Sequence, residues 1–165
     1  LRMIVSSWDK TIANGGADAW KEYKAEFLRA STEAGIAFGY AGCAAVHALS
    51  YPLGSVYHIP HGQSNQLMFK DVMKKYKEKA AGGRINELEE ILAGLLRVEP
   101  EDSLEGLYSL MDNILKKEPL RNFGVKEEDL EIFAGEVLKT QQRLLKNNYI
   151  ALTEEDILDI YRAAF

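Results

Sequence analysis

The stretch Ser103-Leu104-Glu105-Gly106-Leu107-Tyr108-Ser109-Leu110-Met111-Asp112-Asn113-Ile114-Leu115 carries the pattern that decides the fold class. Leu104, Leu107, Tyr108, Met111 and Leu115 recur at spacings of three and four, which places them on one face of an α-helix. Similar apolar stripes run outward from it, through Ile85 to Leu95, through Leu130 to Leu145, and from Trp20 through Tyr23 and Phe27 to Leu28. We interpret each stripe as the buried face of a helix.

Helix breakers and caps separate these stripes. Asn14-Gly15-Gly16 divides the first helix from the second, and Gly82-Gly83 ends a helix expected over residues 71–80. Thr153 to Asp156 resembles a capping box before the last helix. Only Ser55 to Ile59 is a candidate strand, and a weak one. The pattern therefore predicts an all-α fold of seven to nine helices, in a single domain over residues 1–165.

The bulk composition excludes several classes of function. The chain has 165 residues, of which 47% are hydrophobic, and this is enough for one sizeable core. The net charge is −5, so the chain lacks the excess of positive charge that would attract nucleic acid or an anionic membrane. No apolar run reaches the roughly 18–20 residues that cross a bilayer. The single cysteine, Cys43, is expected to be a buried, inert thiol in a reducing cytoplasm.

The segment around residues 41–62 has features that a plain helical core does not need. Ala41 to Ala45 is a run of small residues, which lets a backbone or ligand approach closely. Gly54 and Gly62 are expected to bracket a loop that contains Pro52 and Pro60, after which a helix begins.

All three histidines of the chain, His47, His58 and His61, lie within this segment. Imidazole is the commonest protein ligand for transition metals, and His47 and His61 could meet across the turn between two helices. A catalytic metal usually has three or four protein ligands. The spacing alone therefore leaves two interpretations open, half of a metal site or two structural histidines bonded to backbone carbonyls.

Three blocks of this region resemble the signature of the iron-containing (group III) alcohol dehydrogenases. They are residues 34–42 (AGIAFGYAG), 46–54 (VHALSYPLG) and 60–65 (PHGQSN). The blocks occur in the same order as in the family, and the sequence spacing between His47 and His61 is the same as that between the two corresponding family histidines. Residues 120–125 (LRNFGV) and 152–165 resemble later family elements, so the likeness covers essentially the whole chain.

This resemblance implies a two-domain dehydrogenase. An N-terminal nucleotide-binding domain would bind NAD or NADP, and a C-terminal helical domain of the dehydroquinate synthase-like fold would hold a divalent metal, Fe(II) or in some members Zn. One Asp and three His bind the metal in the family, and two of these match His47 and His61. Hydride would pass between the nicotinamide and a small alcohol or aldehyde. Homodimers are common in the family.

Two motifs of the family pattern are missing from the chain. It has no Gly-rich nucleotide-binding turn and no Asp-x-x-x-His pair before Ala34, and it begins with Leu1. We therefore expect a fragment that lacks the N-terminal domain, contributes no cofactor-binding residues and is inactive alone.

Tyr51 is a second departure, since many members have a histidine there, one helical turn after the first ligand. Tyr51 is expected to be a catalytic residue that faces the metal and donates a hydrogen bond to the substrate, with a core aromatic as the alternative. The phrase around it resembles the 4-hydroxybutyrate dehydrogenase branch, which converts 4-hydroxybutyrate to succinate semialdehyde. His58 is expected either to line the substrate pocket or to pack, and Asn65 to fix the loop through backbone bonds.

Three alternatives remain at this level. The chain could belong to another group III enzyme acting on a short-chain alcohol or diol. It could be a glycerol-dehydrogenase-like or dehydroquinate-synthase-like relative, although those lack this phrasing. It could also be a helical interaction module whose histidines are structural.

Overall fold

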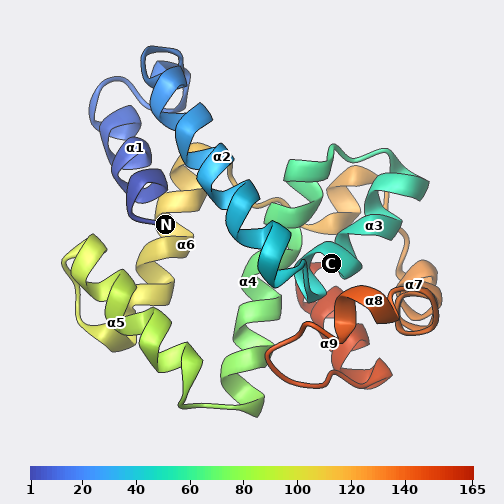
Figure 1. Ribbon diagram of the computed structural model, residues 1–165. Coiled ribbons are helices and arrows are strands. Elements are labelled where there is room, and N and C mark those ends of the chain that lie inside the picture. The colour runs from blue at the N-terminus through green and yellow to red at the C-terminus, as the bar shows by residue number, and fades with distance from the viewer. The chain divides into compact units, whose positions relative to one another are not determined.

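The computed structural model describes residues 1–165, and all of its regular structure is helical. It contains nine α-helices and three short 3-10 helices, which confirms the predicted all-α class (Figure 1). The elements are α1 (Arg2–Ala13), η1 (Ala17–Tyr23), α2 (Lys24–Ala41), α3 (Ala45–Tyr57), α4 (His61–Lys79), α5 (Arg84–Leu96), η2 (Pro100–Asp102), α6 (Ser103–Ile114), η3 (Leu120–Phe123), α7 (Glu127–Thr140), α8 (Gln142–Leu145) and α9 (Glu154–Ala164).

The chain divides into two compact units. The first comprises residues 1–40 and 82–116, and the second comprises residues 41–81 and 117–165. All three histidines therefore belong to the second unit, and the single-domain organisation stays a prediction.

The first unit is built mainly from α1, α5 and α6, which pack against one another. Leu104, Leu107 and Tyr108 of the opening stripe are buried, as predicted. The stripe from Trp20 to Leu28 is not core, because Leu28 is 70% exposed and Trp20 lies in a 3-10 helix with a different periodicity. Helix α2 has one buried residue, Ala30, which makes it the least packed of the long helices.

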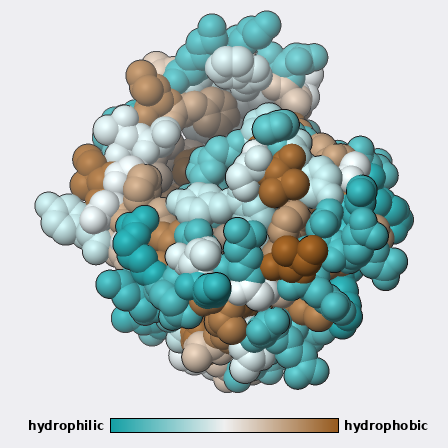
Figure 2. All heavy atoms as spheres, turned by 90° about the vertical axis from the view of Figure 1, so that its right-hand side faces the viewer, coloured by the Kyte–Doolittle hydropathy of each residue, from teal (hydrophilic) through white to brown (hydrophobic).

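The second unit has a continuous apolar core. Helix α3 packs along α4 and also contacts α7 and α8, while α9 packs on α4 and α7. Buried residues from these helices include Leu49, Leu67, Leu130 and Tyr161, and the Tyr161 hydroxyl donates to the Leu49 carbonyl at 2.7 Å. Figure 2 shows the outer surface of this unit as mainly hydrophilic, with isolated hydrophobic residues. This core fixes α3 and α4 relative to each other, and both histidine ligands of the resemblance lie on these two helices.

Helix α3 corrects two predictions. Pro52 lies inside this helix and is buried, rather than in a loop, so the proline removes one backbone hydrogen bond while its ring joins the core. Residues 55–59 are not a strand, because the helix continues to Tyr57 and then ends at His58 in the left-handed conformation, with φ of 56°. The Ile59 amide then donates back to the Leu53 carbonyl, a typical helix end.

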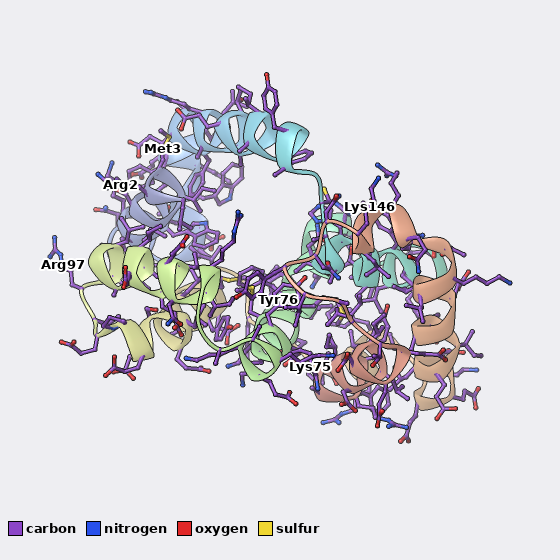
Figure 3. The ribbon with its side chains drawn as sticks, turned by 60° about the horizontal axis from the view of Figure 1, so that its bottom comes forward. Arg2, Met3, Lys75, Tyr76, Arg97 and Lys146 are labelled. Carbon is purple, nitrogen blue, oxygen red and sulfur yellow. The ribbon has the colours of Figure 1, made fainter.

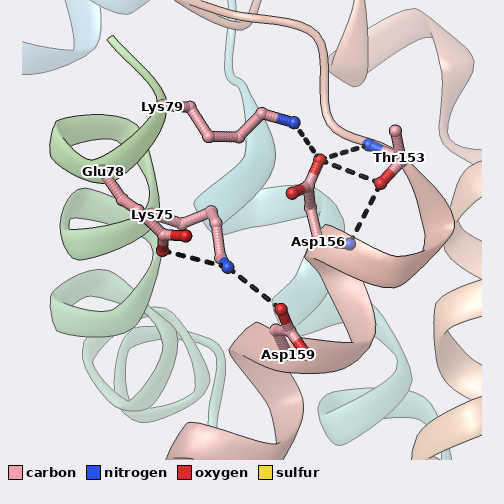
Figure 4. A network of polar contacts seen from close by, with 6 residues as sticks. All are labelled: Lys75, Glu78, Lys79, Thr153, Asp156 and Asp159. Carbon is pink, nitrogen blue, oxygen red and sulfur yellow. Dashed lines mark hydrogen bonds and ion pairs between the residues drawn. The ribbon is translucent and has the colours of Figure 1, made fainter. Parts of the chain in front are cut away.

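Ion pairs join α4 to α9 at the surface of this unit (Figure 4). The Lys75 ammonium lies 3.1 Å from both Glu78 and Asp159, and Lys79 pairs with Asp156. Burial acts to lower the pKa of Lys75, but the two carboxylates outweigh it and raise that pKa. Asp156 also completes the predicted capping box with Thr153. These contacts tie the end of the chain to α4.

No single helix is long and apolar enough to cross a membrane. The helical segments Ala17–Ala41 and Ala45–Tyr57 pass that test only as a bent pair, by length and composition.

Candidate metal and substrate site

The helix that carries His47, α3, is capped at its N-terminus by a residue from a distant part of the chain. The residue before the helix, Ala44, provides no side-chain cap. Instead the Asn148 side-chain oxygen accepts from the Ala45 amide at 2.7 Å and from the Tyr76 hydroxyl at 3.0 Å. Figure 3 shows Tyr76 on α4, next to Lys75. Burial raises the pKa of Tyr76 to about 12, so its hydroxyl keeps the proton that it donates. Asn148 is therefore an N-cap supplied from a distant part of the sequence.

The turn before α3 is held by the neighbouring asparagine. Gly42 adopts a φ of 77°, which favours glycine, and the Asn147 amide donates to the Cys43 carbonyl at 3.0 Å. A Cβ added at Gly42 would lie 2.4 Å from the Asn147 side-chain nitrogen. The cysteine is half-buried, not buried as predicted.

We expect Gly42→Ala to destabilise the protein by about 2 kcal/mol. About 1–2 kcal/mol arises from the left-handed conformation, and the displaced Asn147 amide loses its bond to Cys43. Gly62→Ala is a matched control in the same unit, because a Cβ there meets nothing within 4 Å and the backbone is helical. Urea unfolding measures both variants, and equal stabilities of the two would contradict this account of the turn.

His47 and His61 come together, as the sequence suggested, but His47 lies near the start of α3 and not near the end of a helix as expected, so packing of α3 along α4 brings the rings together. Their ring centroids are 5.3 Å apart. His61 is the first residue of α4, which confirms the predicted helix start, and its ring is exposed. Burial, and secondly the charge of His61, lower the pKa of His47. A lower pKa favours the neutral imidazole, which is the form that binds a metal.

Asn65 occupies the place where the two rings meet. Its side-chain nitrogen lies 3.1 Å from His61 Nε2 and 3.4 Å from His47 Nε2. The expectation that Asn65 fixes the loop through backbone bonds is wrong, because Asn65 is one turn after His61 on α4 and so points toward α3. Its other polar atom, Oδ1, is buried and has no hydrogen-bond partner.

Tyr51 borders the same site. Its ring centroid lies 6.4 Å from that of His61, and both residues line a pocket of about 440 Å³ with Gly54, Ile59 and three serines, Ser50, Ser55 and Ser64. Tyr51 is 37% exposed, so it is not a core aromatic. His58 is exposed and does not line this pocket, so its packing alternative is wrong and its role toward substrate stays a prediction.

The donor set suits a divalent transition metal but is incomplete. The two imidazole Nε2 atoms lie within 3.4 Å of the same atom, the Asn65 side-chain nitrogen, and imidazole is a ligand that suits Fe(II) or Zn. No group of three or more His, Cys, Asp or Glu side chains gathers anywhere in the structure. The structure therefore brings two imidazoles together, and their role as metal ligands stays a prediction.

Sequence reasoning missed Asn147 and Asn148, which position the start of α3. Two adjacent asparagines are typical of an ordinary turn. The residues that flank them in the sequence do not indicate that their partners, Ala45 and Cys43, lie about a hundred positions away.

Comparisons with known proteins agree with this picture. The profile of the Fe-containing alcohol dehydrogenase family, C-terminal, matches residues 1–165. The 4-hydroxybutyrate dehydrogenase of Clostridium kluyveri is 41% identical over the whole chain, and the long-chain-alcohol dehydrogenase 1 of Geobacillus thermodenitrificans is 34% identical. The chain covers 44% and 42% of these two proteins.

Solved structures are similar as well. A 1,3-propanediol oxidoreductase matches with a TM-score of 0.76 at 29% identity, covering 99% of this chain and 43% of that one. An alcohol dehydrogenase from Oenococcus oeni matches with a TM-score of 0.76 at 26% identity, with the same two coverages. The chain therefore belongs to the Fe-containing alcohol dehydrogenase family and corresponds to its C-terminal, helical part.

Proposed function

We propose that this chain is the metal-holding helical part of an NAD(P)-dependent dehydrogenase that interconverts 4-hydroxybutyrate and succinate semialdehyde. The observation that carries the proposal is the close approach of the His47 and His61 rings, whose centroids are 5.3 Å apart, beside a pocket that His61 lines. The remaining metal ligands and the nicotinamide would be held by residues preceding this chain in a longer polypeptide. The proposed location is the cytoplasm and the proposed assembly a homodimer.

His47 and His61 would hold Fe(II) or Zn, which when bound supplies Lewis-acid polarisation of the substrate oxygen. The chain's own task is to hold the two imidazoles close enough for both Nε2 atoms to bind one metal ion. The packing of α3 along α4 does this, because His47 lies in the first turn of α3 and His61 opens α4.

The pocket lining supports a polar substrate. Ser50 and Ser64 donate to backbone carbonyls of His47 and Ile59, so their hydroxyls are already engaged. The Tyr51 hydroxyl forms no hydrogen bond within the protein, so Tyr51 is the pocket residue best able to donate to a substrate oxygen. No lysine or arginine lines the pocket, so within this chain a hydroxyl donor, and not an ion pair, would bind the carboxylate. The 41% identity to the Clostridium kluyveri enzyme favours the same substrate.

Metal analysis and a substrate panel test the proposal with the full-length protein. The purified protein should contain Fe or Zn near one equivalent at neutral pH. It should oxidise 4-hydroxybutyrate in preference to ethanol, butanol and propanediol with NAD or NADP. A metal-free active protein would overturn the dehydrogenase proposal, whereas a preference for the short neutral alcohols would overturn only the substrate.

Tyr51→Phe should lower kcat/KM for 4-hydroxybutyrate by about 10-fold or more, because a hydrogen bond to a charged group contributes about 1.5–3 kcal/mol. Tyr57→Phe is the matched control on the same helix. The Tyr57 hydroxyl contacts Asp129 and the Lys126 amide and does not line the pocket, so kcat/KM should stay within about twofold. Equal effects of the two variants would remove Tyr51 from the substrate site.

A further inference from the structure

The last turns of α2, residues 34–41, have the composition of a buried helix. Their sequence is AGIAFGYA, which contains no charged residue, and α2 as a whole has only one buried residue, Ala30. A helix that is apolar on all sides is normally found inside a protein, whereas a surface helix has a polar face. The composition of this segment therefore calls for a covering partner.

The large side chains of this segment are exposed. Ile36 is 60% exposed, Phe38 55% and Tyr40 92%. Gly39 lies between them, and a Cβ added there would meet nothing within 4 Å. Glycine destabilises a helix relative to alanine, so an open glycine inside α2 brings no gain unless another backbone approaches closely.

The exposed side chains do not share one side of the helix. Ile36 and Tyr40 are four positions apart and lie on the same face. Phe38 is two positions from each of them and so points about 200° away around the helix axis. A second copy of the chain, docked across a two-fold axis, would meet one face of α2 and leave the other in water. Both faces are covered only by a partner that packs around the helix.

The start of the chain lies next to the same helix. Leu1 lines a groove of about 550 Å³ between α1 and α2, together with Glu26, Arg29 and Glu33 of α2 (Figure 1). Residues attached before Leu1 would therefore emerge beside α2, where the covalent tether gives them a high local concentration. The chain covers 44% and 42% of two relatives, and the matching family profile is that of the C-terminal part. In a protein of that length a large polypeptide is available to cover the helix.

We propose that the last turns of α2 are the docking surface for the polypeptide that precedes Leu1 in the longer protein. That polypeptide packs an apolar surface against Ile36 and Tyr40 on one face of the helix and against Phe38 on the other. The proposal rests on the part of the proposed function that places further residues before this chain. Its tests use neither metal nor activity.

The first test is photo-cross-linking of the full-length protein that carries Phe38→p-benzoylphenylalanine. Irradiation and peptide mass spectrometry should show position 38 joined to peptides that precede Leu1. A mixture of unlabelled and nitrogen-15-labelled protein distinguishes a bond within one chain from a bond between two copies. Ile132→p-benzoylphenylalanine on α7 is the control, because Ile132 is exposed and the residues one turn away on either side, Glu128 and Glu136, are charged. It should give no cross-link to those peptides.

The second test compares two isoleucines that are exposed to the same extent, Ile36 at 60% and Ile132 at 61%. Ile36→Arg should lower the Tm of the full-length protein by about 5 °C or more, because it places a charge in a buried apolar contact. Ile132→Arg should change the Tm by no more than about 1 °C. If Ile36→Arg does not fold, the cross-links from position 38 decide the question.

Cross-links from position 38 only to a second copy, or only to residues 1–165 of the same chain, would overturn the inference, and so would the absence of any cross-link. Equal Tm shifts in the two arginine variants would also overturn it. If the expected cross-links formed in a protein that bound no metal and oxidised no alcohol, the proposed enzymatic function would fail while the docking surface would stand.

Discussion

Replacing His61 with alanine in the full-length protein should lower kcat/KM by about 10³-fold or more and remove the bound metal. A metal acting as a Lewis acid stabilises the transition state by several kcal/mol, and each 1.36 kcal/mol corresponds to about tenfold in rate. His61 is exposed and opens α4, so its loss removes a ligand without opening a cavity in the core. The melting temperature of the metal-free protein should therefore change little.

The pair His47→Ala and His61→Ala sharpens this expectation. Both rings would bind the same metal ion, so either single variant should destroy the proposed site, and the double variant should be no worse than either alone. Kinetics with 4-hydroxybutyrate and elemental analysis measure the three proteins in parallel. Retention of metal together with activity within about tenfold of wild type would show that the histidines are structural.

The fold class was predictable because helical periodicity depends on local spacing. Leu104, Leu107 and Tyr108 are buried on one helix face, as their spacing required. The capping box at Thr153 and the helix start at His61 were also predictable from the sequence, because both depend on residues within one helical turn. The approach of His47 and His61 was suggested by their spacing, but it depends on the packing of α3 along α4, because His47 lies in the first turn of α3.

The failures share another cause, since each depends on packing or on partners far along the chain. The stripe at Leu28 has helical spacing, but Leu28 is 70% exposed and α2 buries only Ala30. Pro52 looks like a loop residue, yet burial of its ring offsets the lost hydrogen bond inside α3. Asn65 was expected to bond to backbone, and its real partners depend on the angle at which α4 meets α3.

Asn148 offers the second large effect, this time on stability. Asn148→Leu should lower the free energy of unfolding by about 2–4 kcal/mol, because it leaves two donors, the Ala45 amide and the Tyr76 hydroxyl, without an acceptor. Each unsatisfied buried donor costs about 1–3 kcal/mol. Asn147→Leu is the matched control. That neighbour is exposed and bonds only backbone carbonyls, so its loss should cost about 1 kcal/mol or less.

Asn148→Asp should retain most of the stability that the leucine variant loses. The Asn148 side-chain nitrogen is buried and has no partner, so replacing it removes an unsatisfied donor. The new carboxylate keeps both accepted bonds and places a negative charge at the N-terminus of α3, which is favourable. Two donors to the charged form outweigh its partial burial, so its folded-state pKa should lie below the unfolded value near 4. The added stability is therefore present above that value and is lost as the pH falls through the folded-state pKa.

A double-mutant cycle with Tyr76→Phe separates the two bonds that Asn148 accepts. If one oxygen joins α3, α4 and the chain after α8, the Tyr76 hydroxyl matters only while Asn148 is present. Tyr76→Phe should cost about 1 kcal/mol in the wild type, and in the Asn148→Leu background it should be neutral or stabilising. The coupling between the two positions should thus exceed about 1 kcal/mol in urea unfolding. Strictly additive effects would mean that Tyr76 and Asn148 act independently, and that the start of α3, with His47 on it, is held by packing alone.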